Sequence, residues 1–321
     1  MKRKVNQVGT GTLTVSLPSK WVEKHSLVKG QEIEVIENGE DLRLSASDQK
    51  HEKRKAFLNL DNFNKMMINR YLHEFYRQGI EEITLYYTKD HIPDYKNNTT
   101  ISIDHYVKKV IDRFIGLEII SQTKNKIILE SLLTKEETVK LPLVQKRIFF
   151  LIKEFQDEFL KAMDGDFLKF HNICYDIHDN IARFIYYYLR LLHSSDLPED
   201  YKTRLFNVYM FIDKMIDKMR NISERIQENN AKTLKMKSIL KDIFSFFQSQ
   251  FVLLHQPDTK IDQVEELIHK RYALMHSIIR EKFTPAEYQV MMEARILIDI
   301  PDIFVETFVS LNLEKFTSTQ S

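Results

Sequence analysis

Glycine is scarce in this chain and is distributed unevenly along it. The sequence has seven glycines, and the first 40 positions hold four of them: Gly9, Gly11, Gly30 and Gly39. Glycine supplies the tight turns and positive φ angles that connect short strands. This clustering therefore predicts turn-rich β structure at the front of the chain and long helices behind it.

Residues 1–46 carry alternating strand and turn signals. Pro18 ends a stretch in which polar and apolar residues alternate, and Asn38-Gly39 is a strong hairpin signal. The expected elements are a strand over residues 12–17, a short helix over 20–25, and strands over 32–35 and 41–44. So short a segment, without a disulfide, cannot bury enough apolar surface by itself. A second copy of the chain is the remaining way to complete its core, so we expect a homodimer.

Several of these residues resemble the AbrB/SpoVT/MazE family of swapped-hairpin domains. The resemblance rests on Leu17-Pro18 at the end of the first strand, on Trp21, and on the Leu27-x-x-Gly30 segment before the next strand. It implies that two chains interleave their hairpins into one β-barrel, of which each chain supplies half. It also implies that basic residues of this domain face double-stranded DNA.

The residues expected to contact DNA are Lys2, Arg3, Lys4, Lys20 and Lys24. Residues 1–30 contain Glu23 as their only acidic residue, whereas the whole chain has a net charge of +1. The family often places a basic residue directly after its first glycine, where this chain has Thr10, so contacts with phosphates are expected rather than base reading. The alternative is that these are solvated charges on a domain used only for dimerisation.

Residues 47–140 are expected to form a charged linker followed by a small α/β connector domain. The expected elements are a helix over residues 60–78, a strand over 83–87, a loop over 93–100, a helix over 103–114, and paired strands over 117–122 and 126–129. The spacing of the polar residues in this part matches no catalytic motif.

Residues 141–315 show the period of long amphipathic helices joined by short loops, which predicts antiparallel bundles. Thr284-Pro285 followed by Glu287 has the spacing of a capping box, and Pro301 is expected to kink the last helix. The expected helices cover residues 143–163, 166–194, 199–228, 231–255, 259–283 and 285–314. They divide into two three-helix repeats, residues 141–228 and 231–315.

The helical half resembles PhoU, the phosphate-uptake regulator family. Asp213 and Asp217, followed by Asn221-Ile222, match an acidic motif of that family, and the Tyr76–Gly79 segment resembles the connector of archaeal proteins that join an AbrB-like domain to a PhoU domain. The fold class expected for the whole chain is therefore multidomain α+β. It comprises half of a swapped-hairpin barrel, a small α/β domain and two PhoU-like three-helix bundles.

Four acidic residues of the first repeat are candidate ligands for a divalent or ferric ion: Asp176, Asp179, Asp213 and Asp217. Carboxylates four residues apart lie on one helix face, and two such faces, with His178 nearby, could surround a cation. The alternative is a solvated acidic face paired with Lys214, Lys218 and Arg220. In the second repeat Ile298 replaces the first acidic residue, so a matching second cluster is not expected.

Bulk composition excludes several classes of protein. One cysteine, Cys174, rules out an intrachain disulfide, and no run of 18 apolar residues is present, so a cytoplasmic protein without a transmembrane segment is expected. No phosphate-binding glycine loop or nucleophile motif occurs, so we expect no enzyme. The expected function is a dimeric, DNA-binding transcriptional regulator of phosphate uptake. The alternative is a PhoU-like signalling adaptor that contacts a phosphate transporter or sensing protein and uses its N-terminal domain only to dimerise.

Overall fold

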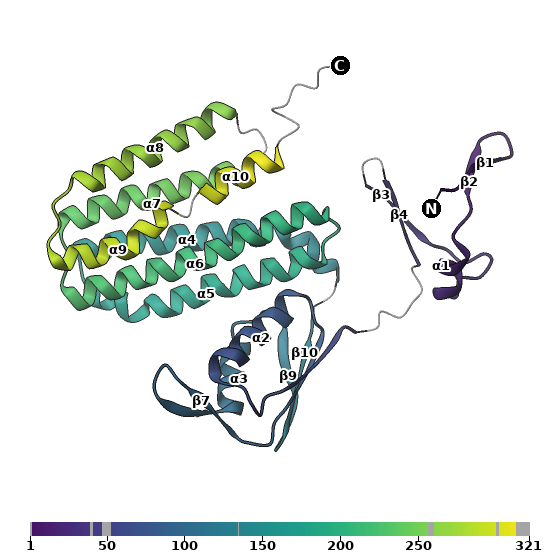
Figure 1. The fold of residues 1–321 in the computed structure, drawn as a ribbon, viewed down its shortest axis with the longest axis horizontal. Coiled ribbons are helices and arrows are strands. Elements are labelled where there is room, and N and C mark those ends of the chain that lie inside the picture. The colour runs from purple at the N-terminus through teal and green to yellow at the C-terminus, as the bar shows by residue number, and fades with distance from the viewer. Residues whose placement is uncertain are drawn as a thin grey trace. The chain divides into compact units, whose positions relative to one another are not determined.

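A computed structural model describes residues 2–38, 41–46, 53–133, 135–255, 260–299 and 302–312. The chain is a mixed α+β protein with small sheets and a helical C-terminal part (Figure 1), which confirms the expected class at that level. It separates into two compact units, Met1–Lys53 and Arg54–Ser321.

The first unit contains two separate antiparallel hairpins. Its elements are β1 (Val5–Val8), β2 (Thr12–Val15), α1 (Ser19–Lys24), β3 (Glu34–Asn38) and β4 (Asp41–Ser45). Val5 lies opposite Val15, and Gly9, with a φ of +69°, lies in the turn between β1 and β2. β3 pairs only with β4, so the hairpins form two sheets rather than one (Figure 1). Gly39 of the predicted Asn38-Gly39 turn lies outside the described residues.

The second unit begins with an α/β part built on a four-stranded sheet. Its elements are β5 (Lys55–Asn59), α2 (Lys65–Arg77), β6 (Glu82–Tyr86), β7 (His91–Asp94), β8 (Thr99–Ser102), α3 (Ile103–Ile111), β9 (Leu117–Thr123) and β10 (Lys126–Ser131). The sheet order is β5-β6-β10-β9, with β5 parallel to β6. Alternate residues of the two central strands, among them Ile83, Leu85, Ile127 and Leu129, are fully buried in the core that α2 and α3 share.

Two parts of this sheet region differ from the sequence prediction. The expected loop over residues 93–100 is wrong, because β7 and β8 form a hairpin in which Pro93 lies opposite Thr100. A two-stranded ribbon tolerates proline, since an outward-facing position needs no backbone N–H. β5 was also not expected, because a run of charged residues precedes it and hides its short alternating pattern.

The helical part matches the expected helix order closely. Its elements are α4 (Leu141–Asp164), α5 (Phe167–Ser194), α6 (Glu199–Asn229), α7 (Leu234–His255), α8 (Ile261–Arg280), α9 (Pro285–Asp299) and α10 (Asp302–Leu311). The capping box is confirmed, because the backbone N–H of Thr284 donates to Glu287 and that of Glu287 donates to the Thr284 hydroxyl. The last predicted helix is two helices, and the kink expected at Pro301 lies outside the described residues.

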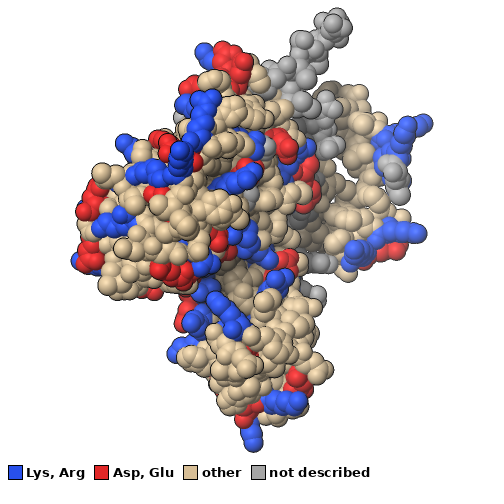
Figure 2. Space-filling view, turned by 60° about the vertical axis from the view of Figure 1, so that its left-hand side comes forward, with Lys and Arg blue, Asp and Glu red and all other residues tan. Residues whose placement is uncertain are grey.

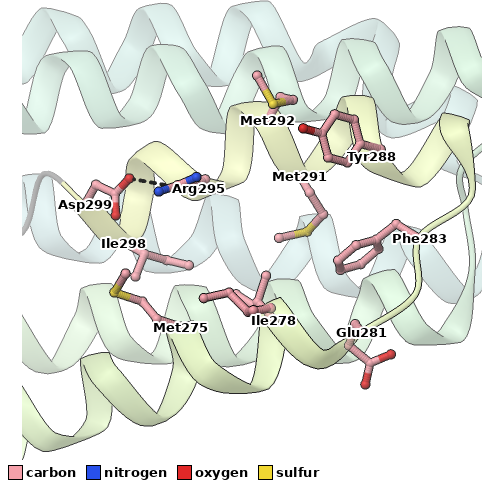
Figure 3. A pocket seen from close by; sticks show the side chains of 11 residues that line it. Met275, Ile278, Glu281, Phe283, Tyr288, Met291, Met292, Arg295, Ile298 and Asp299 are labelled. Atoms are coloured by element: carbon pink, nitrogen blue, oxygen red, sulfur yellow. Dashed lines mark hydrogen bonds and ion pairs between the residues drawn. The ribbon is translucent and has the colours of Figure 1, made fainter.

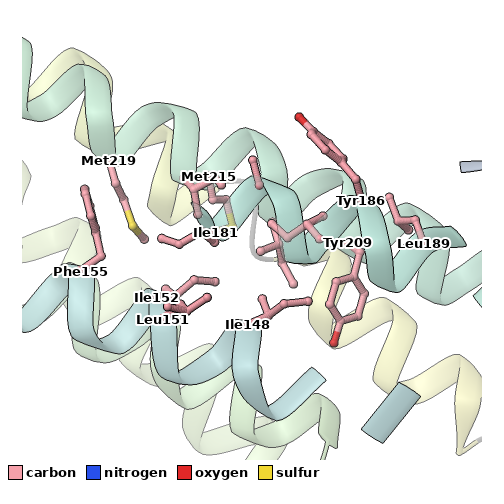
Figure 4. Packing of buried hydrophobic residues seen from close by; sticks show 14 of the residues in the cluster. Ile148, Leu151, Ile152, Phe155, Ile181, Tyr186, Leu189, Tyr209, Met215 and Met219 are labelled. Atoms are coloured by element: carbon pink, nitrogen blue, oxygen red, sulfur yellow. The ribbon is translucent and has the colours of Figure 1, made fainter. Parts of the chain in front are cut away.

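Most buried apolar residues of the helices belong to one continuous core, and a second, smaller cluster lies among α7, α8 and α10. Ile148, Leu151 and Phe155 of α4 face Ile181 of α5 and Met215 of α6 (Figure 4). The same core includes buried residues of α7 and α9, so both sets of helices share it. No helix among the described residues is long and apolar enough to cross a membrane.

A buried arginine connects the α/β part to the helices. The guanidinium of Arg190, on α5, donates to the carbonyls of Tyr76 (2.8 Å) and Ile80 (3.1 Å) and to the Ser131 hydroxyl (2.9 Å). It also lies 5.0 Å from the centre of the Tyr76 ring, which stacks on Phe114. Arg190 is 4 % exposed, so these contacts are shielded from water and hold α2 and β10 against α5.

The first residue of the second unit also contacts α5. Arg54 donates to the Gln78 carbonyl (2.6 Å) and lies 2.9 Å from Nε2 of His193, at the end of the helix. Burial, and then the charge of Arg54, lower the pKa of His193. The neutral ring can therefore accept the hydrogen bond from Arg54.

We predict that Arg190→Ala destabilises the second unit strongly. The substitution leaves the buried Tyr76 carbonyl and the partly buried Ile80 carbonyl without their charged donor, which should lower the free energy of unfolding by about 3 kcal/mol. Arg183→Ala, on the exposed side of the same helix, should change it by less than about 0.5 kcal/mol. Urea unfolding followed by circular dichroism measures both, and equal effects would contradict the role given to Arg190.

Candidate functional site

The first unit exposes many of its apolar side chains and buries none of them fully. No residue of known burial within residues 2–46 is buried. Apolar residues of both hairpins and of the segment between them are exposed by half or more: Val5 64 %, Val8 59 %, Leu13 69 %, Val15 51 %, Val28 71 %, Val35 53 % and Leu42 66 %. A folded domain normally buries such residues, so the surface they form is suited to another protein surface.

The residues predicted to bind DNA are all exposed in this unit. Lys2, Arg3 and Lys4 precede β1, while Lys20 and Lys24 lie four residues apart on α1. Since Val5 pairs with Val15, the N-terminal segment leaves the first hairpin at the end from which the chain continues into α1. Both groups of basic residues thus extend from the same end of that hairpin.

The larger unit distributes its charge differently. In Figure 2 its visible surface carries acidic and basic side chains interspersed, without a broad area of one sign. A near-neutral mixed surface gives no general attraction for a polyanion. The concentration of positive charge that could attract one is in residues 1–30.

A second polar site lies between α5 and α6. His178 on α5 is buried, and its two ring nitrogens lie 3.0 Å from Asp179 and 3.0 Å from Asp217. Arg113, which follows α3, donates to the other oxygen of Asp179 at 2.7 Å. Lys214 bridges Asp213 at 3.2 Å and Asp217 at 3.3 Å.

These contacts favour a protonated His178. Burial lowers the pKa of the imidazole, but hydrogen bonds to Asp179 and Asp217 raise it, and the net pKa lies above the usual 6.5. An imidazole can donate from both nitrogens only when it is protonated. Burial raises the pKa of Asp217, but hydrogen bonding to His178 and the charge of Lys214 outweigh it and lower the pKa to about 2.

The structure brings together only some of the predicted metal ligands. Asp179, Asp213 and Asp217 lie around His178 and Lys214, whereas Asp176 is exposed to solvent and does not join this group. No group of three or more ligating side chains in the described part of the chain has an arrangement that could hold a metal ion.

The side chains as arranged do not fit a cation. Lys214 lies between the two aspartates that a metal would share, and both nitrogens of His178 are used by carboxylates. A metal would have to displace the ammonium group of Lys214 and release the proton of the His178 imidazole. Asp213 and Asp217 pair with Lys214, and Asp217 with Arg220, as in the alternative offered by the sequence. That alternative is wrong in two respects, because Asp213 is buried rather than solvated and Lys218 pairs with Glu293.

Sequence reasoning missed Arg113 in this site. It lies 66 residues from Asp179 in the chain, and no local pattern marks a contact between separate parts of a fold. Ile298, which the expected alignment of the two repeats places opposite Asp213, is buried, and Asp299 pairs with Arg295.

Comparison of the chain with models of known protein families, with curated proteins and with solved structures finds no match. The two sites are therefore interpreted from their own geometry.

We predict that His178 stabilises the protein in a pH-dependent way. Because its pKa is raised on folding, its contribution is fully present below about pH 6.5 and is lost as the pH rises through the raised value. His178→Gln should lower the free energy of unfolding by about 2 kcal/mol near pH 5.5, and by less near pH 8.5. His105→Gln, at an exposed position, should show no such trend in urea unfolding.

Proposed function

We propose that two copies of this chain form a non-enzymatic, DNA-binding regulator of transcription. The observation that carries the proposal is the first unit, in which no residue of known burial is fully buried and both hairpins expose apolar side chains by half or more. About 45 residues without a core do not remain folded alone. A second copy supplies two more hairpins of the same kind and so completes a β core.

The proposed two-chain unit also doubles the positive charge. Each copy contributes Lys2, Arg3 and Lys4 beside its first hairpin and Lys20 and Lys24 on α1. A two-fold arrangement repeats these groups, as duplex DNA repeats its phosphates. Phosphate contacts need only exposed lysine and arginine, and these residues meet that requirement.

The link to phosphate uptake rests on the resemblance of the helical part to PhoU. In this proposal the helices sense phosphate status, or a phosphate transport or sensing protein, and the first unit carries that state to DNA. The alternative is an adaptor that contacts the transporter or its regulator and uses the first unit only as a dimer module. The regulator and the adaptor differ in whether the basic residues contribute to DNA binding.

The dimer is tested through Trp21, the one tryptophan of the chain, which lies on α1 and reports on the first unit alone. We expect its unfolding midpoint, followed by fluorescence, to rise with protein concentration, as for a folded dimer. Leu13→Asp should abolish this transition, because it would place a charge in the shared core.

Leu143→Asp is the matched control, since Leu143 on α4 is 66 % exposed, close to the 69 % of Leu13. It should leave the Trp21 transition unchanged. A midpoint independent of concentration, or equal effects of the two substitutions, would refute the shared core.

DNA binding is tested by replacing Lys2, Arg3 and Lys4 with glutamate in the full chain. Binding to a mixed-sequence duplex is measured at low and at moderate salt. The unaltered protein should lose affinity steeply as salt rises. The variant lacks six basic residues per dimer, so it should bind at least about tenfold more weakly, with a salt slope smaller by roughly five.

Replacing Lys146, Lys153 and Lys161, three exposed lysines of α4, with glutamate is the control for net charge. It should have little effect on the salt slope. Unchanged affinity in the N-terminal variant, with the Trp21 transition intact, would favour the adaptor.

A further inference from the structure

Helix α8 carries an apolar stripe on its outer face. Ile261, Ile268, Tyr272 and Ile279 are 51, 40, 53 and 74 % exposed. At 3.6 residues per turn, all four lie within about 20° of one line along the helix. Val264 and Leu267 are the buried residues of α8, so the stripe is distinct from the packed side.

The apolar surface continues across a groove between α8 and α9. Met275 and Ile278 of α8 and Met291 of α9 point into a cavity of about 370 Å³ (Figure 3). Tyr288 and Met292, on the outer side of α9, are 59 and 58 % exposed. Exposed apolar surface of this extent, with charged groups at its edges, is typical of a protein–protein contact.

The charges of α8 are divided between its two halves. Residues 261–267 contain three acidic residues and no basic one: Asp262, Glu265 and Glu266. Residues 268–280 contain three basic residues and no acidic one: Lys270, Arg271 and Arg280. Two such helices repel each other when parallel and attract each other when antiparallel.

We propose that the stripe of α8 packs antiparallel against α8 of a second copy of this chain. When the two-fold axis passes through the middle of the stripe, Ile261 lies beside Ile279 of the second copy, and Ile268 lies beside Tyr272 of the second copy. Asp262 and Arg280 lie on the same flank of the stripe, and antiparallel helices bring equal flanks together. The acidic half of each α8 therefore lies beside the basic half of the other α8, and this favourable contact occurs twice.

A second copy fits this surface better than a different protein would. A two-fold contact requires one surface to match itself, and the stripe with its divided charge has this property. The choice of a second copy also agrees with the two-chain unit proposed above, which holds two α8 helices at high effective concentration. The α8 contact nevertheless rests on its own residues and is tested separately.

The test uses engineered cysteines in the full chain. The native Cys174 is buried and gives no background. Ile261→Cys/Ile279→Cys should form a covalent dimer on mild oxidation, seen on a non-reducing gel. Within one chain these positions are about 27 Å apart along the helix, so no internal disulfide can form. Neither single variant should cross-link, because antiparallel packing places the single cysteine of one copy about 27 Å from that of the other.

Charge reversal then tests the orientation. In the double-cysteine background, Asp262→Lys or Arg280→Glu alone should lower the cross-linking rate by about fivefold, as expected for two repelling surface pairs. The two substitutions together should restore it. Both reversals act against the helix dipole, so recovery in the combined variant cannot come from a more stable helix.

Tyr272→Glu should abolish cross-linking, whereas Phe150→Glu, at a 59 % exposed position of α4, should not. Absence of the covalent dimer, cross-linking of the single variants, or failure of the combined reversal to restore it would overturn the proposal. Trp21 fluorescence on the same samples reports whether the first unit still associates. Loss of the α8 contact is therefore distinguishable from loss of the proposed regulator dimer.

Discussion

The larger unit depends on a charged group buried where its two kinds of structure meet. Arg190 replaces water for the carbonyls of Tyr76 and Ile80 and for the Ser131 hydroxyl. A buried guanidinium is stable only when all its neighbours are correctly placed, so the contact fixes α2 and β10 against α5. The α/β part is consequently an integral part of the helical body, and Arg113 can reach Asp179 across the same junction.

The sequence was most informative where a pattern is local. Helix periodicity and the Thr284–Glu287 capping box located the long helices to within a few residues, because both signals come from neighbours along the chain. The failures were short strands. β5 and β7 have four or five residues each, and their pairing with β6 and β8 is a tertiary choice that no local alternation specifies.

The polar site shows the same limit. The spacing of Asp213 and Asp217 correctly placed both on one side of α6, where Lys214 bridges them and Asp217 contacts His178. Spacing alone does not show whether such carboxylates bind a metal ion from solvent or pair with a basic side chain of the same protein. Here Lys214, one residue after Asp213, folds back between them, and Arg113 arrives from a distant element.

Helix α5 carries three of the polar contacts described above. His178 lies near its middle, Arg190 near its end, and His193 beside Arg54, where the larger unit begins. Because α5 is one continuous helix, it joins the His178 site to the contact between His193 and Arg54, about 22 Å farther along its axis. The position of Arg54, where the larger unit begins, is therefore set by the same helix that carries the polar site.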